Sequence, residues 1–274
     1  MSLNSSNPTI QPAVVSELAV TPTPPNKPVV SLSRRILLCI GLPVWAFLGF
    51  MLAQALVVVI IEVLTKLGVP LNQINNSLFQ VIAGGVIYAL TLLIVIGVPY
   101  LVKKARTTKE ELGMQRLPIL TDFLWVPAGA LVYLVLTAVV TAVAMSFLTF
   151  VNYDQAQDTG FTNIGQQHEY ILAFIMLVVI APLAEELLFR GYLFGKLRKY
   201  APLWISILIT SLLFAIVHFA WNVGLDVFAL SIVLCLLRVI TGSLWPSIML
   251  HMLKNGVAFY FLFINPTVIS TLGG

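Results

Sequence analysis

The sequence predicts an all-α membrane protein, a polytopic bundle of about seven transmembrane helices. Of its 274 residues, 59% are hydrophobic and only 9% are charged, whereas soluble domains carry about 45–50% apolar and about 25% charged residues. The apolar residues recur in long runs, each near the roughly 20 residues that cross a bilayer as a helix. This composition argues against a soluble globular enzyme, because too few polar side chains are present to cover its surface.

Residues 1–33 predict a disordered tail. The segment is rich in Ser, Asn, Thr and Pro and lacks periodic apolar positions, a composition that cannot bury a core. Arg34 and Arg35 then precede the first apolar run, residues 36–61. This run is too long for the apolar region of a signal peptide and ends without a small-residue cleavage pattern, so we expect it to be the first span.

Six further spans follow from the hydropathy of the chain. We place them near residues 78–102, 123–150, 170–200, 202–220, 227–240 and 245–264. The polar stretch 105–118, between the second and third spans, predicts a short interfacial helix. The sixth run has only about 14 residues, or about 21 Å of helix. We therefore expect the segment 241–246 that follows it to turn inside the bilayer.

The positive charges predict the orientation. Of the 15 Lys and Arg residues, thirteen fall on one side of this topology, Lys66 falls on the other, and Lys254 lies inside the last span. The thirteen are Lys27, Arg34, Arg35, Lys103, Lys104, Arg106, Lys109, Arg116, Arg190, Lys196, Arg198, Lys199 and Arg238. Because cytoplasmic loops carry the excess of Lys and Arg, we expect a multi-pass integral membrane protein with a cytoplasmic N-terminus and an external C-terminus. The excess of Lys and Arg on cytoplasmic loops then accounts for the net charge of +4. We therefore expect the lipid bilayer, and no nucleic acid, as a partner.

Polar side chains inside the spans are the candidates for function, because burying them in a bilayer is costly. In the fourth predicted span, the adjacent carboxylates of Glu185 and Glu186 point about 100° apart on a helix. Glu186 and Arg190 are four residues apart with the acid first, the favourable order for an ion pair. We therefore expect Glu186 to pair with Arg190 and Glu185 to face a cavity as a general base. A purely structural charge network between spans is the alternative.

Two further clusters have the four-residue spacing of a single helix face. Phe214 and His218 lie in the fifth predicted span, and His251 and Asn255 lie in the seventh. Each cluster alone is as compatible with hydrogen bonds between helices as with catalysis. If the chain turns near residues 201–202, where a proline ends the preceding helix, then Glu185 and His218 lie at the same height across a hairpin.

The three clusters together resemble the motifs of a known protease family. They are Glu185-Glu186-x-x-x-Arg190, Phe214-x-x-x-His218 and His251-x-x-x-Asn255. They resemble the motifs of the CAAX protease and bacteriocin-processing family (CPBP, also called Abi), which includes the type II CAAX prenyl endopeptidase. The resemblance covers about residues 170–265, and a Glu-Glu-Leu-Gly stretch at 110–113 is similar to the family's link before its core. It divides the chain into a tail (1–33), N-terminal membrane helices (34–165) and a protease core that contains the last four spans (166–274).

The resemblance implies an intramembrane endopeptidase whose substrate is a membrane-anchored protein or peptide. By this resemblance, Glu185 looks like the base that activates water, with His218 beside it. His251 and Asn255 look like the donors that hold this water or stabilise the oxyanion. The residues expected to support them are Glu186, Arg190 and Phe214. The identity of the substrate, whether it is prenylated, and the oligomeric state stay open.

Metal dependence also stays open at this point. Glu185, His218 and His251 are ligands that zinc accepts, with water in the fourth position. The chain lacks the His-Glu-x-x-His run of zinc proteases, so we expect a glutamate mechanism that requires no cofactor, with zinc as the alternative.

Two other classes of function compete with the protease. A catalytically silent scaffold or regulator with the same fold would carry the motifs without cleaving anything. A small transporter would use Glu185 and His218 as a proton relay. Such a transporter is expected to contain inverted repeats or matching broken helices, and we find neither pattern in the sequence.

Overall fold

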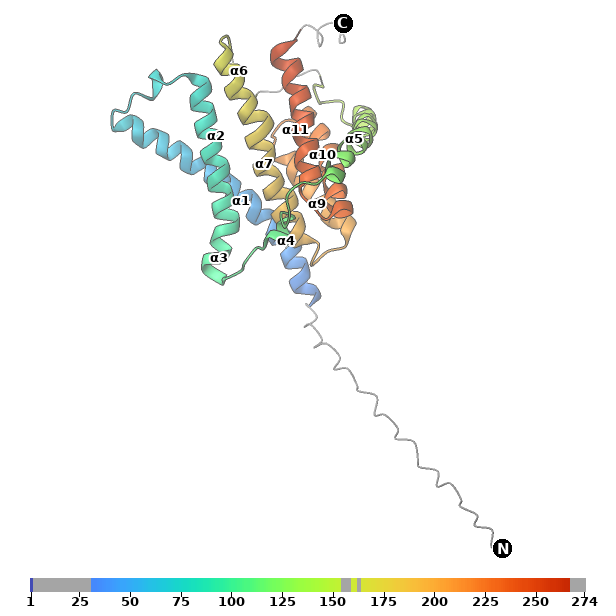
Figure 1. Cartoon of the computed structure of the whole chain (residues 1–274). Helices are drawn as coiled ribbons and strands as arrows, with labels where there is room; N and C mark the ends of the chain where they lie inside the picture. The colour runs from blue at the N-terminus through green and yellow to red at the C-terminus, as the bar shows by residue number, and fades with distance from the viewer. Residues whose placement is uncertain (2–30, 154–158, 162–163, 267–274) are drawn as a thin grey trace. The chain divides into compact units, whose positions relative to one another are not determined.

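The computed structural model describes residues 1, 31–153, 159–161 and 164–266, and the ordered elements in these ranges are all helices. Six of the helices are long and apolar enough to cross a membrane. Their bounds are Leu32–Lys66, Asn76–Lys103, Leu120–Phe147, Gln167–Leu197, Trp221–Thr241 and Trp245–Ile264. A shorter apolar helix, α9 (Leu203–Ile216), follows the fourth of them. The expectation of an all-α polytopic bundle is thus confirmed (Figure 1).

Three of the long helices change from α-helical to π-helical geometry along their length. The second consists of α2 (Asn76–Leu92), η2 (Leu93–Gly97) and α3 (Val98–Lys103). The fourth, here called the central helix, consists of α6 (Gln167–Phe174), η3 (Ile175–Ile180), α7 (Ala181–Glu186), η4 (Leu187–Leu193) and α8 (Phe194–Leu197). The last consists of α11 (Trp245–Phe259) and η5 (Tyr260–Ile264). Because π-helical turns are rare and concentrate at functional sites, the two that flank α7 draw attention to its glutamates.

The central helix lies in the interior of the bundle, between α2 and α11 (Figure 1). Its most apolar stretch is 44% buried inside the protein, and that of α10 (Trp221–Thr241) is 61% buried. The corresponding stretch of α5 (Leu120–Phe147) is only 11% buried. The central helix, which carries Glu185 and Glu186, and α10 therefore form the core, and the outer helices expose apolar side chains of the kind that faces lipid.

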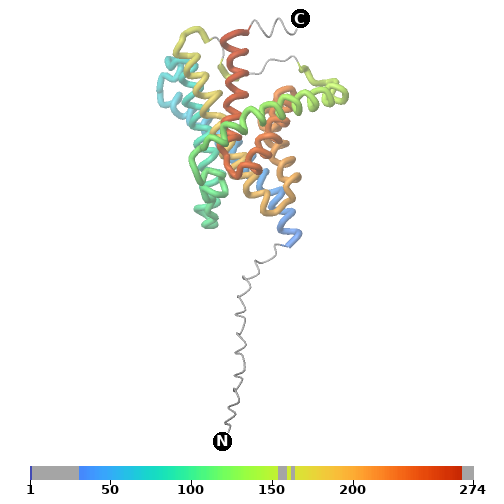
Figure 2. Tube along the Cα trace, turned by 45° about the vertical axis from the view of Figure 1, so that its right-hand side comes forward, coloured from blue at the N-terminus to red at the C-terminus, as the bar shows by residue number. Residues whose placement is uncertain are grey.

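Helix α5 crosses α11 at a steep angle (Figure 2) but packs along α10, from Leu237 near one end to Asp226 near the other. The crossing point is close, because a Cβ atom on Gly129 would lie 3.0 Å from the side chains of both Leu237 and Leu250. A glycine at this position therefore lets α5 rest on the two inner helices.

The expectation of a short sixth span was wrong. Helix α10 has 21 residues and begins at Trp221 rather than at residue 227. The charge of Asp226 interrupts the apolar run in the sequence, but Lys254 pairs with it in the structure, so the helix continues through this position. The short helix is instead α9, with 14 residues or about 21 Å, against about 30 Å of hydrocarbon core. The position of the segment 241–246 relative to the bilayer stays a prediction.

The predicted interfacial helix is helical only over α4 (Lys109–Leu112), and the rest of the segment 105–118 is irregular. Helix α4 packs against the end of the central helix, where a Cβ on Gly195 would lie 2.8 Å from the Glu111 carbonyl oxygen. The Glu111 carboxylate accepts a hydrogen bond from Lys196 Nζ at 2.6 Å and also pairs with Lys199. Glycine at position 195 is therefore what permits the close approach.

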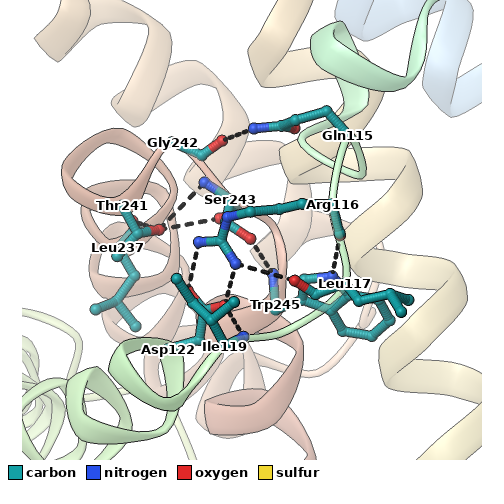
Figure 3. A network of polar contacts seen from close by, with 10 residues as sticks. All are labelled: Gln115, Arg116, Leu117, Ile119, Asp122, Leu237, Thr241, Gly242, Ser243 and Trp245. Atoms are coloured by element: carbon teal, nitrogen blue, oxygen red, sulfur yellow. Dashed lines mark hydrogen bonds and ion pairs between the residues drawn. The ribbon is translucent and has the colours of Figure 1, made fainter.

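The same segment is tied to the turn between α10 and α11 (Figure 3). Gln115 Nε2 donates to the Gly242 carbonyl at 3.0 Å, and Trp245 Nε1 donates to the Arg116 carbonyl at 2.8 Å. Arg116 also pairs with Asp122 at the start of α5. The segment 105–118 thus connects the central helix with α5, α10 and α11.

Two details of the predicted topology need correction. Of the thirteen charges assigned to one side, Arg190 and Arg238 are buried in the protein, so they are not loop charges. Most of the predicted tail, residues 1–33, lies outside the described residues, but α1 already begins at Leu32. The orientation of the termini stays a prediction.

Candidate active site

The charged pair of the central helix is fully enclosed. Arg190 Nη1 donates to Glu186 Oε1 at 2.8 Å, and both side chains are 0% exposed. The Arg190 guanidinium also lies over the ring of Phe214, 4.2 Å from its centre, a favourable cation–π contact. The structure therefore contains the ion pair that the spacing predicted, and it places Phe214 beside this pair.

His251 of α11 lies between the two glutamates. Its Nδ1 atom is 2.9 Å from Glu186 Oε1, and its Nε2 atom is 3.7 Å from Glu185 Oε2. An ionised carboxylate can only accept a hydrogen bond, so Nδ1 is the donor to Glu186. In a neutral imidazole, Nε2 then presents a lone pair toward Glu185.

Glu185 and His218 line the same small cavity. Its volume is about 140 Å³, and its other walls are Phe50, Tyr88, Leu188, Phe189 and Val217. Since a water molecule occupies about 30 Å³ in the liquid, the cavity has room for about four of them. The structure therefore brings Glu185 and His218 to one cavity; that they lie at the same height across a hairpin stays a prediction.

His218 follows the end of α9, in the turn at 217–220. Its Nδ1 atom is 2.7 Å from the Phe214 carbonyl oxygen, and because a carbonyl only accepts, Nδ1 carries the hydrogen. The Phe214 ring packs edge-on against both histidine rings, with centroid distances of 5.0 Å to His218 and 5.7 Å to His251. Phe214 thus fixes the positions of both histidines through packing.

Asn255 has a different partner from the one expected of an oxyanion donor. Its Nδ2 atom donates to the Leu177 carbonyl at 2.9 Å, in the π-helical stretch η3. It is not among the residues that line the cavity. Of the four predicted catalytic residues, Glu185 and His218 line the cavity. His251 does not line it but lies 3.7 Å from Glu185, and Asn255 connects α11 to the central helix one turn further along. His168, which we did not assign to the site, is exposed in α6.

Tyr88 of α2 is a site residue that the sequence analysis missed. Its hydroxyl donates to Glu185 Oε1 at 2.5 Å, and its ring lines the cavity. Tyr88 lies in an apolar run with no charged neighbour, so no spacing or motif in the sequence indicates its role.

A second polar cluster, which the sequence analysis also missed, joins three helices. Asp226 of α10 accepts hydrogen bonds from Tyr133 at 2.5 Å and Thr137 at 3.1 Å, both on α5. Lys254 Nζ of α11 lies 3.0 Å from the other oxygen of the same carboxylate. Here a signal existed, because a lysine inside a span requires a partner of opposite charge.

The geometry does not assemble the zinc ligand set. Within the described ranges, no three His, Cys, Asp or Glu side chains are close enough to hold a common metal ion. Glu185, His218 and His251 therefore do not form a metal site in this arrangement, and metal dependence stays a prediction.

Comparison with known proteins bears on the segment that contains the site. Residues 167–257 match the family model described as type II CAAX prenyl endopeptidase Rce1-like. The membrane-embedded CAAX protease MroQ of Staphylococcus aureus is 32% identical over 103 residues, which are 35% of this chain and 42% of that protein. An uncharacterized 24.3 kDa protein of Escherichia coli is 34% identical over 98 residues, which are 34% of this chain and 45% of that protein.

A third relative is the UPF0177 protein YxdF of Lactococcus lactis, which is 42% identical over 66 residues, 23% of this chain and 36% of that protein. The chain thus spans less than half the length of each of these curated relatives. No solved structure matches it. All residues of the three motifs fall inside the matched segment 167–257. The resemblance of residues 167–257 to the CAAX protease and bacteriocin-processing family is therefore confirmed.

Proposed function

We propose that the protein is an intramembrane endopeptidase that hydrolyses peptide bonds with a water molecule activated by Glu185 and His251. The observation that carries this proposal is the distance of 3.7 Å between Glu185 Oε2 and His251 Nε2. With Nδ1 of His251 donating to Glu186, both facing atoms are hydrogen-bond acceptors. A water molecule placed about 2.8 Å from each of these two atoms, a normal hydrogen-bond distance, would donate one hydrogen to Glu185 Oε2 and the other to His251 Nε2.

Such a water is oriented for attack on a carbonyl carbon. Its two hydrogens are held by Glu185 and His251, so its lone pairs point away from them. As the new C–O bond forms, Glu185 takes one proton, and it later returns this proton to the leaving amine. Glu186 supports the step through His251, since its hydrogen bond to Nδ1 fixes the ring and its tautomer.

His218 lines the same cavity as Glu185 and is suited to move protons there. Its Nδ1 hydrogen is bound to the Phe214 carbonyl, so a neutral ring presents an acceptor at Nε2 and a protonated ring presents a donor. Asn255 remains a candidate donor to the oxyanion, because its amide nitrogen carries a second hydrogen besides the one that Leu177 accepts.

The substrates we propose are membrane-anchored proteins or peptides. The similarity to the Rce1-like family and to a relative named as a membrane-embedded CAAX protease supports this class. The cavity of about 140 Å³ is smaller than the roughly 300–1,000 Å³ of ordinary ligand pockets. An extended peptide therefore enters only when the side chains that line the cavity move.

The proposal is tested by comparing the peptides that membranes release when they contain the wild-type protein or the Glu185→Gln variant. We expect products that depend on the wild-type protein and disappear with Glu185→Gln, which keeps the size of the side chain but removes the base. Tyr133→Phe, at the cluster on α5, is the matched control and should keep the products. Products that persist with Glu185→Gln would show that Glu185 is not the base. If the wild-type protein forms no products and Glu185→Gln keeps its cellular phenotype, a scaffold is the better description.

A further inference from the structure

Tyr88 reaches the site from outside the segment that matches the protease family. It lies on α2, whereas the match covers residues 167–257. Its hydroxyl hydrogen bond to Glu185 Oε1, at 2.5 Å, is short, as expected for an O–H donor to a charged oxygen. The N-terminal helices therefore complete the polar site, and Phe50 of α1 joins them in the cavity wall.

Because of this hydrogen bond, the two oxygens of the Glu185 carboxylate have different partners. Tyr88 holds Oε1, while Oε2 faces His251 Nε2. The last torsion of a glutamate side chain is broad and roughly two-fold, so packing alone fixes the plane of the carboxylate poorly. A strong donor on Oε1 removes this freedom and keeps Oε2 directed at the position of the water.

We propose that Tyr88 is a positioning residue, which holds the Glu185 carboxylate so that Oε2, and not Oε1, acts as the base. This inference rests on the proposed function, since it assigns a role within the same reaction. Tyr88 acts through Glu185 and forms no bond to the reacting atoms itself.

A purely structural role for the hydroxyl is less well supported, because α2 has other attachments to the central helix. Gly84 lies against Met176, where a Cβ would be only 2.5 Å from the methionine Cε atom. At the start of α2, Asn75 Nδ2 donates to Glu169 Oε1 at 2.8 Å. Removing one hydroxyl from Tyr88 leaves both contacts in place, so the helix should stay docked.

The chain contains a matched control for the test. Tyr133 donates to Asp226 Oδ1 at 2.5 Å, the same donor, acceptor type and distance as in the bond of Tyr88. The Asp226 carboxylate is not among the groups that line the cavity. Tyr133→Phe therefore removes an equivalent hydrogen bond at a place where the positioning role is absent.

The experiment uses the full-length protein in lipid nanodiscs and compares wild type, Tyr88→Phe, Tyr133→Phe and Glu185→Gln. The probe is a synthetic copy of a peptide that membranes release with wild type but not with Glu185→Gln. For Tyr88→Phe we expect kcat to fall by about 10- to 100-fold, the cost of a slightly misplaced group, while KM changes by less than about twofold. Incorporation of 3-fluorotyrosine at position 88, which restores the hydroxyl, should recover most of the lost kcat.

A second readout needs no substrate. The carboxylate stretching band of Glu185 is identified in infrared difference spectra as the band that Glu185→Gln lacks. It should shift in Tyr88→Phe and stay unchanged in Tyr133→Phe. An unshifted band, or a Tyr88→Phe protein that folds and cleaves at the wild-type rate, overturns the positioning role and leaves the proposed function intact. If wild type cleaves nothing, the proposed function fails first, and this inference fails with it.

Discussion

Two carboxylates of the bundle, Glu185 and Asp226, each accept a hydrogen bond from a tyrosine but have different surroundings. Glu185 and Asp226 each accept a hydrogen bond of 2.5 Å from a tyrosine hydroxyl. Asp226 also has an ammonium group, Lys254 Nζ, at 3.0 Å. Glu185 has no Lys or Arg within ion-pair distance in the described part of the chain, and faces His251 at 3.7 Å instead.

The comparison distinguishes carboxylates that are paired with a cation from one that is not. A cation neutralises the charge of Asp226, and Arg190 does the same for Glu186. The pair of Asp226 and Lys254 joins α10 to α11, and the pair of Glu186 and Arg190 lies within the central helix. Glu185 has neither a Lys nor an Arg partner among the described residues and lines a cavity. In the proposed reaction it is the carboxylate of the three that acts as the base.

The largest expected effect comes from neutralising the two carboxylates in turn. Glu185→Gln should lower kcat by about 10²- to 10⁴-fold, the usual contribution of a general base, without loss of folding. Asp226→Asn should instead lower stability by about 1–3 kcal/mol, because it leaves Lys254 without its charged partner, and should keep most of its activity per folded molecule. Kinetics together with thermal unfolding in detergent would separate the two effects. Similar kinetic defects in both variants would remove the distinction.

The next effect follows from removing a cation from a paired carboxylate. Arg190→Ala leaves Glu186 buried with an unbalanced charge, so we expect a loss of about 3–5 kcal/mol in stability and a poor yield of folded protein. The double variant Glu186→Gln, Arg190→Met should recover the yield but not the activity, because His251 then loses its charged acceptor. Yield is measured as the monodisperse fraction in size-exclusion chromatography. Full activity of the double variant would show that Glu186 does not act through His251.

A smaller effect is expected at a carboxylate outside the membrane. Burial is the largest influence on Glu111 and raises its pKa, but hydrogen bonds and charge from Lys196 and Lys199 outweigh it and lower the pKa overall. The stability from these contacts is therefore complete above the unfolded pKa of about 4.3 and is lost as the pH falls through the lower folded value. Since the Lys199 side chain is 45% exposed, we expect only about 0.2–1 kcal/mol. Unfolding temperatures at pH 6 and near pH 3 should differ less for Glu111→Gln than for wild type.

Removal of metal should have no effect. If a zinc ion supplied the cation that Glu185 lacks, exhaustive chelation would abolish cleavage and zinc would restore it. We expect activity to persist after chelation, and the purified protein to contain no stoichiometric zinc by elemental analysis. A stoichiometric zinc ion that is needed for cleavage would reverse the argument drawn from the comparison with Asp226.

Sequence reasoning succeeded where the signal lies within one helix. The apolar runs predicted the membrane helices, and the four-residue spacing predicted the pair of Glu186 and Arg190. It failed where the outcome depends on a partner from another helix. The continuation of α10 through Asp226 depends on Lys254, and the role of Tyr88 depends on how α2 packs against α7. No local pattern encodes such contacts, because they arise only when the helices assemble. The catalytic roles themselves stay predictions.

The small volume beside Glu185 has a consequence for selectivity. If the proposed hydrolysis takes place there, a polypeptide must first displace walls such as Phe50 and Phe189. The binding energy for this displacement would be drawn from parts of the substrate far from the scissile bond. The proposed enzyme would then discriminate between proteins at the moment of entry, before any bond is broken.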